Sequence, residues 1–138
     1  MGQYFVAGNH TTKQFIQPHA FGDGLKFGEF TAATHGFMLG LAWLLRRDEV
    51  TELLPPDSLL GSWAYKATFI AGDYTKEDIY HDVYENYEDI SMRLIKELVK
   101  AKEMDRETLA DQVRWRMMPA MSSEKEQADY RTFLGDLL

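Results

Sequence analysis

The chain has 138 residues, 45% of them hydrophobic, and a formal net charge of −7. This size and composition fit one domain with its own hydrophobic core and argue against extensive disorder. The absence of cysteine excludes a disulfide framework, a thiolate metal site and a cysteine nucleophile, so we expect a protein of the reducing cytoplasm.

The sequence shows no secretory signal and no membrane span. The start "MGQYFVAGNH" lacks a basic segment and a long apolar run, and Val6 stands where a myristoylation motif requires Ser or Thr. The most apolar segment, Phe30 to Leu45, has 16 residues, fewer than the roughly 20 that cross a bilayer. We therefore expect a core helix there and no contact with a membrane.

An opening β-hairpin is predicted from residues 3–8 and 13–17, which are rich in aromatic and β-branched residues and flank a turn-like "NHTT". Pro18 ends the second strand, because proline cannot donate to a sheet ladder. The "GDG" at 22–24 then predicts a structural corner, with Phe21 buried as its anchor and Gly22 or Gly24 at positive φ. The next six residues, "LKFGEF", are compatible with a strand or with the start of a helix.

A helix is predicted over residues 31–47, ending where arginines suit the C-terminal dipole. Its Ala33, Gly36 and Gly40 form a stripe of small residues. Glycine costs about 1 kcal/mol relative to alanine inside a helix, so the stripe indicates a close contact. We expect that contact to be internal, with a homo-oligomer as the alternative.

After the break "PPDS", alternating apolar residues predict a strand over residues 62–72. From Tyr74 on, the periodicity is helical, with helices predicted over 76–87, 91–103 and 106–118. Ser123 and Glu126 form a capping box for a last helix. Its apolar face comprises Tyr130, Phe133, Leu134 and Leu137.

These elements predict a single α+β domain spanning residues 1–138. A small antiparallel sheet, made of the N-terminal hairpin and one later strand, is covered by four to five helices. The segment Phe30 to Leu45 packs across the sheet, because no other segment is apolar enough to cover it.

Motifs for catalysis, nucleotides or metals are missing from the sequence. The glycines at 22, 24 and 28 are spaced one residue too far for a dinucleotide fingerprint, and no P-loop, GxSxG or HExxH occurs. His10, His19 and His35 lack the i, i+4 spacing of helical zinc ligands, so solvated or core histidines are favoured. We expect no catalytic residue, no metal and no cofactor.

Four polar residues beside the turns are candidates for binding a small anionic ligand. They are His19, Asp23, Lys26 and Asp73. Lys26 and His19 would hold the anion, and Asp73 would orient a histidine. A structural role is favoured for the aspartates, because aspartate commonly bonds backbone in tight turns.

A second candidate surface lies in the acidic half of the chain. Residues 1–70 carry five basic and six acidic side chains, whereas residues 71–138 carry ten and sixteen. In a helix, Asp78, Asp82, Glu85 and Asp89 would form a carboxylate stripe beside a tyrosine stripe. The tyrosines are Tyr80, Tyr84 and Tyr87. Most such stripes are solvated faces, but tyrosine favours interfaces, and the acidity suits a basic protein partner while arguing against nucleic acid.

The opening "MGQYFVAGNHTTKQFIQPHAFGDGLKFGEF", the segment "SWAYKATFIAGDY" and "YEDIS" resemble a family of small uncharacterised prokaryotic and phage proteins. Its members begin like MGxYYVxVN, continue PHxFGxGLKxxE, and later show a Trp-containing strand that ends AGDY. The matching positions are Asn9, Pro18, His19, Phe21, Gly22, Gly24, Leu25, Lys26, Glu29, Trp63, Gly72, Asp73 and Tyr74. The match covers roughly the first two-thirds of the chain and implies no activity. This chain has "WAYK" where the family tends to have Gly-Asp after the Trp.

Two hypotheses follow for function. The first is a small acidic cytoplasmic binding protein, a phage-encoded accessory or anti-defence factor that inhibits a host protein. The second is an enzyme or a binder of a small, nucleotide-like anion, with a pocket between the "PHAFGDGLK" corner and the "AGDY" turn. We favour the first, because no spacing in the sequence calls for catalysis.

Overall fold

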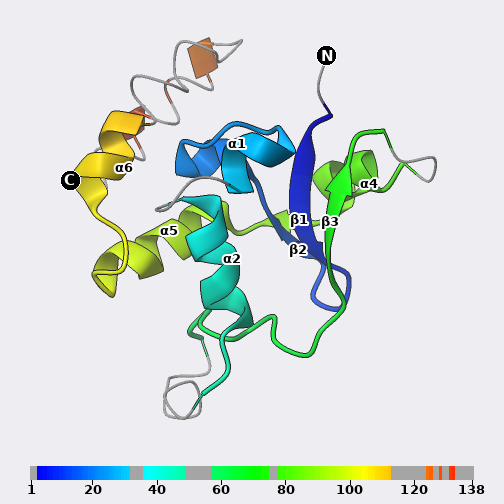
Figure 1. The fold of residues 1–138 in the computed structure, drawn as a ribbon, viewed down its shortest axis with the longest axis horizontal. Coiled ribbons are helices and arrows are strands. Elements are labelled where there is room, and N and C mark those ends of the chain that lie inside the picture. Colours follow the sequence, from blue (N-terminus) through cyan, green and yellow to red (C-terminus); the bar gives the residue numbers. More distant parts are fainter. Residues whose placement is uncertain are drawn as a thin grey trace.

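The structure is a computed structural model that describes residues 3–31, 36–48, 57–74 and 78–112, together with residues 124, 125, 128, 131 and 132. Within these ranges the chain forms one four-stranded sheet and five α-helices (Figure 1). The α+β class is therefore confirmed. The five described helices include two, α1 (Phe27–Thr31) and α2 (Phe37–Leu45), in the region where one helix was predicted.

The N-terminal hairpin forms as predicted: β1 (Phe5–Asn9) pairs antiparallel with β2 (Gln14–Ile16). In the turn, Oδ1 of Asn9 accepts hydrogen bonds from the backbone N–H groups of Thr11 (2.9 Å) and Thr12 (3.1 Å). An asparagine that bonds backbone two or three residues ahead stabilises a tight turn. This bond explains why "NHTT" reverses the chain.

The later strand joins the hairpin, but it is shorter than predicted. β3 (Thr68–Gly72) pairs antiparallel with β1, and residues 60–65 form turns instead of a strand. Trp63 is fully buried, whereas Tyr65 is 92% exposed and has a φ of 62°. Residues two apart in a strand share a face, so the alternation that begins at Trp63 does not reflect a strand.

A fourth strand, which the sequence did not predict, makes the sheet mixed. β4 (Glu88–Asp89) pairs parallel with β2, giving the order β3-β1-β2-β4. Two backbone bonds secure it, from Glu88 N to Lys13 O (2.8 Å) and from Ile90 N to Phe15 O (3.0 Å). The purely antiparallel three-stranded sheet was wrong, because two acidic residues give no strand signal of their own.

The helix predicted over residues 31–47 is not continuous. A short 3₁₀ helix η1 (Pro18–Phe21) leads to α1 (Phe27–Thr31), and α2 (Phe37–Leu45) begins only after Gly36. Gly36 has φ −123° and ψ −128°, which are not helical values. Of the two alternatives for "LKFGEF", the structure shows the start of a helix, α1. Because Gly36 precedes α2, the predicted stripe of small residues does not run along one helix. Ala33 and His35 lie outside the described residues.

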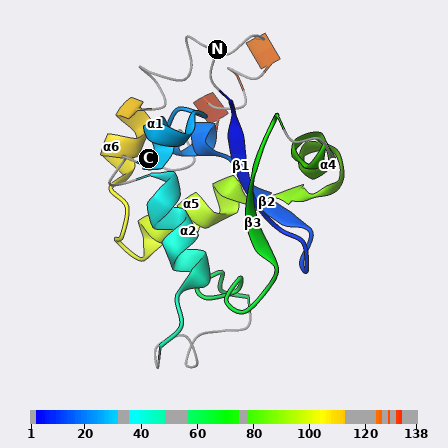
Figure 2. The same ribbon diagram turned by 45° about the vertical axis from the view of Figure 1, so that its right-hand side comes forward.

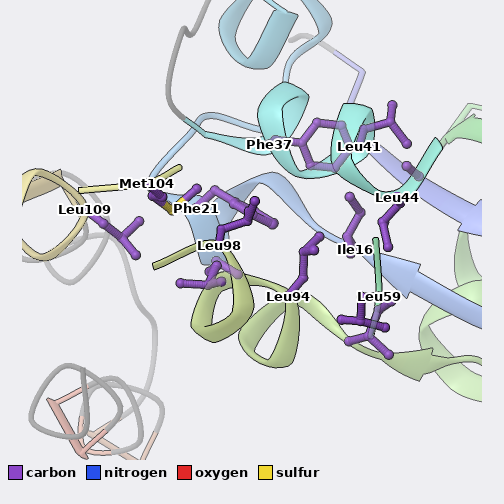
Figure 3. Close-up of a cluster of buried hydrophobic side chains, with 14 of the residues drawn as sticks. Ile16, Phe21, Phe37, Leu41, Leu44, Leu59, Leu94, Leu98, Met104 and Leu109 are labelled. Carbon is purple, nitrogen blue, oxygen red and sulfur yellow. The ribbon is translucent and has the colours of Figure 1, made fainter. Parts of the chain in front are cut away.

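Two hydrophobic clusters lie on the two faces of the sheet. The larger one joins the sheet to α1, α2, α5 (Ser91–Lys100) and α6 (Arg106–Gln112), and Figure 3 shows many of its side chains. The smaller one joins the opposite face to α4 (Ile79–Asn86), which Figure 2 shows alone on that side. Residues Phe37, Leu41 and Leu44 of α2 are buried in the larger cluster, as predicted.

The predicted helices of the second half are present where the structure describes them. The helix predicted over 106–118 is described to Gln112, and Ser123, Glu126 and the apolar face of the predicted last helix lie outside the described residues. No helix within the described ranges is long and apolar enough to cross a membrane.

Candidate functional site

The "PHAFGDG" segment forms the structural corner that the sequence predicts. Phe21 is fully buried, and Gly22 has a φ of 78°, a conformation that a residue with Cβ resists. Backbone bonds from Gly22 N to His19 O (3.0 Å) and from Asp23 N to Pro18 O (3.1 Å) close the turn. His19 is half-buried within it.

Asp23 has a structural partner far along the chain. Its Oδ2 accepts a hydrogen bond from the backbone N–H of Phe37 (2.7 Å), and Asp23 is only 5% exposed. The bond satisfies one of the N–H groups that the first turn of α2 leaves open. Asp23 thus caps α2 from the corner, instead of bonding only its own turn.

Lys26 and Asp73 lie on opposite sides of the Tyr4 backbone. Tyr4 forms a β-bridge with Lys26, donates its backbone N–H to Oδ1 of Asp73 (3.0 Å) and accepts the N–H of Asp73 at its carbonyl oxygen (2.9 Å). The backbone of Tyr4 therefore lies between Lys26 and Asp73.

The acidic face of α4 is exposed, whereas its tyrosines differ in burial. Asp78, Asp82 and Glu85 are all exposed, and the acidic pair of β4, Glu88 and Asp89, is exposed as well. No Lys or Arg occurs between residues 77 and 92. These exposed carboxylates are here called the acidic face, and the segment that carries them contains His81 but no Lys or Arg.

Two of the three tyrosines pack inward. Tyr87 is 9% exposed in the smaller cluster, and Tyr80 is half-buried against it. Burial raises the pKa of the Tyr80 hydroxyl above its usual value, opposed in part by a hydrogen bond with Tyr84. Tyr84 is 37% exposed and packs edge-on against Phe15, with 5.2 Å between ring centroids. Tyr80 and Tyr87 therefore anchor α4, and Tyr84 contributes part of its ring to the outer surface.

A pocket of about 410 Å³ opens between β3 and α4. It is lined by His10, Phe69, Ile70, Ala71, Ile79, Asp82 and Tyr87. Sequence reasoning had selected Asp82 and Tyr87 but missed the pocket, because its walls come from a turn, a strand and a helix that are far apart in the chain. Gly8 is a local sign that another group packs closely against β1 near the pocket, since a Cβ at this position would approach the Phe69 ring to 2.8 Å.

Among the residues that line the pocket, His10 contacts two polar groups. Its Nδ1 lies 3.0 Å from the hydroxyl of Tyr87 and 3.0 Å from Nζ of Lys13. The Lys13 ammonium also lies 5.0 Å from the centroid of the Tyr87 ring.

The described residues contain no group of three or more His, Asp or Glu placed to hold a metal ion. Asp78 and His81 form a close acid–imidazole pair at the exposed start of α4.

Comparison with protein-family models, with curated proteins and with solved structures finds no match to this chain.

Proposed function

We propose that this chain is a small acidic binding protein that contacts a basic surface of a partner protein through the acidic face. The observation that carries the proposal is the set of exposed carboxylates on α4 and β4, in a segment with no Lys or Arg. Charge of one sign gathered on one surface speeds association with a surface of the opposite sign.

The anchoring of α4 supports an interface more than a merely solvated helix. Val83 is fully buried beneath the helix, and Tyr80 and Tyr87 pack on the sheet, so the outward carboxylates are held on a rigid support. A rigid surface loses little conformational entropy on binding. The exposed part of Tyr84 adds apolar area beside the charges.

In its biological form, the proposal follows the family resemblance: a cytoplasmic, phage-encoded accessory or anti-defence factor that inhibits a host protein. The alternative, an enzyme or a binder of a small anion at the corner, has less support. The carboxylates of Asp23 and Asp73 accept backbone hydrogen bonds there, and they would repel an anion.

Carboxyl-to-lysine cross-linking in prokaryotic host lysate tests the proposal. We expect a zero-length carbodiimide to join Asp78, Asp82 or Glu85 to lysines of one host protein, as mapped by mass spectrometry. The variant Asp82→Lys with Glu85→Lys should lose this product. The variant Glu107→Lys with Asp111→Lys, which makes the same charge change on exposed positions of α6, should keep it.

Capture should also weaken with added salt, because exposed charges are screened. Equal capture by wild type and by both double variants would refute a role for the acidic face.

A further inference from the structure

The outer edge of β3 is not paired within the described residues. β3 is the first strand in the order β3-β1-β2-β4, and its only ladder is with β1. Backbone bonds from His10 N to Ala67 O and from Asp73 N to Tyr4 O show that the odd-numbered residues of this segment bond toward β1. Because the direction alternates along a strand, the N–H and C=O of Ile70 point away from β1.

The pocket lies beside this edge. Phe69 and Ala71 pair with Gly8 and Val6, so their side chains lie on the face of the sheet that α4 covers. Ile70 lies at the edge and is 41% exposed. A strand added to β3 would place alternate side chains on the α4 face, over the pocket. Open backbone groups and an adjacent apolar pocket are the two parts of a site that binds an extended peptide.

The negative charges beside the pocket favour a basic ligand over a second copy of this acidic chain. Asp82 lines the pocket, Glu85 is exposed on the same helix, and exposed Asp78 directly precedes that helix. A second copy paired edge to edge through β3 would bring two such helices, each on a chain of net charge −7, toward each other. A strand with an apolar residue flanked by Lys or Arg on the same face complements both the pocket and the carboxylates.

We propose that an extended segment of the partner adds to β3 as a fifth strand, with an apolar side chain in the pocket and a basic side chain beside Asp82. This inference rests on the proposed function and adds to it the form in which the partner binds. The Ile70 N–H and C=O bond the backbone of the added strand.

The probe for the test is a capped synthetic peptide, acetyl-TKTITKT-amide, added to the full-length ¹⁵N-labelled protein. Its Lys, Ile and Lys share one face of a strand, and its threonines share the other. We expect saturable binding, with the amide signal of Ile70 shifted downfield and protected from exchange.

Two backbone-methylated forms of the peptide test strand pairing without any change to the protein. One carries N-methyl groups at its even positions and the other at positions 3 and 5, so each loses the N–H groups of one edge. One form should bind like the parent, and the other should not bind. Loss by both forms, loss by neither, or no binding of the parent would overturn strand addition.

Protein variants separate the edge from the acidic face. Ile70→Pro removes the outward N–H and no bond to β1, and Ile70→Ala is its matched control because it removes the same side chain but keeps the N–H. We expect the proline variant to bind the peptide about tenfold more weakly than the alanine variant. Equal binding by the two variants would overturn the inference.

Asp82→Lys, and the peptide with both lysines replaced by glutamate, should each weaken binding. If binding depends on the Ile70 N–H but not on these charges, the acidic face fails as the partner site while strand addition stands. If binding depends on the charges but not on the N–H, the acidic face stands and strand addition fails.

Discussion

Gly40 lies where α2 meets the corner and α5. A Cβ built at this position would come within 2.9 Å of the Phe21 ring and 3.0 Å of Cδ2 of Leu94. Gly36 is equally restricted, because its Cβ would overlap the carboxylate of Asp23. Both glycines therefore mark the close internal contact that their cost in a helix indicates, although Gly36 precedes α2 and does not lie within it.

Replacing Gly40 by leucine should lower the free energy of unfolding by roughly 1–3 kcal/mol, because the larger side chain overfills a packed site. Gly28→Ala in α1 is the control, since a Cβ there meets no atom within 4 Å. The control should raise stability by up to about 1 kcal/mol through helix propensity. Urea unfolding of both variants measures the difference, and a stabilising Gly40→Leu would contradict the contact.

His81 is the titrating residue at the exposed start of α4. Its hydrogen bond to Asp78 and the charge of that carboxylate raise the pKa of His81 above 6.5. A raised folded-state pKa means that the pair stabilises the fold fully below about pH 6.5 and that this contribution is lost as the pH rises through the folded-state pKa. NMR titration should show the raised pKa in wild type and a return toward 6.5 in Asp78→Asn. An unchanged His81 pKa in that variant would rule out the pair as the cause.

At the scale of elements, α2 is positioned at both ends by distant side chains. Asp23 caps its first turn, and its last turn is held by Glu97 of α5, whose Oε2 accepts the indole N–H of Trp43 (2.6 Å). Oε1 of Glu97 also accepts the backbone N–H of Leu59 (2.9 Å). One carboxylate thus joins α2, α5 and the loop that follows α2.

Asp23→Ala should lower the free energy of unfolding by about 1–3 kcal/mol, because it leaves the N–H of Phe37 without an acceptor near the core. Asp23→Asn, which keeps an acceptor oxygen of similar geometry, should lose less. Chemical unfolding gives both values. An alanine variant as stable as the asparagine variant would show that the bond to Phe37 is not important.

Glu97→Ala should lower stability by roughly 2–4 kcal/mol, since it removes the acceptor of two N–H groups at once. Glu97→Gln keeps one oxygen and should show a smaller loss. Glu103→Ala, at an exposed position, removes the same charge as Glu97→Ala and is the control; it should leave stability nearly unchanged. The fluorescence of Trp43 should shift to the red in the alanine variant, and an unshifted emission would argue against the bond.

At the scale of the whole molecule, the sheet separates two cores, and the loop before β3 belongs to the larger one. Trp63 donates its backbone N–H to Leu44 O (2.9 Å) and its indole N–H to Gln14 Oε1 (3.1 Å). Its ring is fully buried in the larger cluster. A single residue, through its backbone N–H and its indole N–H, therefore joins the end of α2 to the sheet.

Trp63→Ala should cost roughly 3–5 kcal/mol, a large share of the 5–15 kcal/mol that stabilises a typical domain. Tyr65→Ala, two residues away at a 92% exposed position, should change stability by less than about 0.5 kcal/mol. Thermal unfolding of the two variants tests this assignment. Equal losses of stability would indicate that Trp63 and Tyr65 are buried on one face, as the predicted strand over residues 62–72 requires.

The sequence by itself determined the α+β class, the hairpin, the corner at Phe21 and Gly22, and the helices α4, α5 and α6 of the second half as far as the structure describes them. Each of these features depends on local turn chemistry or on hydrophobic periodicity, and both are determined by residues close together in the sequence. Asp82 and Glu85 of the predicted carboxylate stripe lie on α4, whereas Asp78 precedes this helix and Asp89 lies in β4, so the stripe was predicted only in part.

Tertiary structure alone decided the break at Gly36, the late start of β3, the parallel strand β4 and the pocket. Asp23 reaches Gly36 and Phe37 only because the corner folds against α2, and β4 exists only because backbone groups of Lys13 and Phe15 lie beside it. These features depend on contacts between residues far apart in the chain, whose favourable energy exceeds local preference and leaves no local pattern.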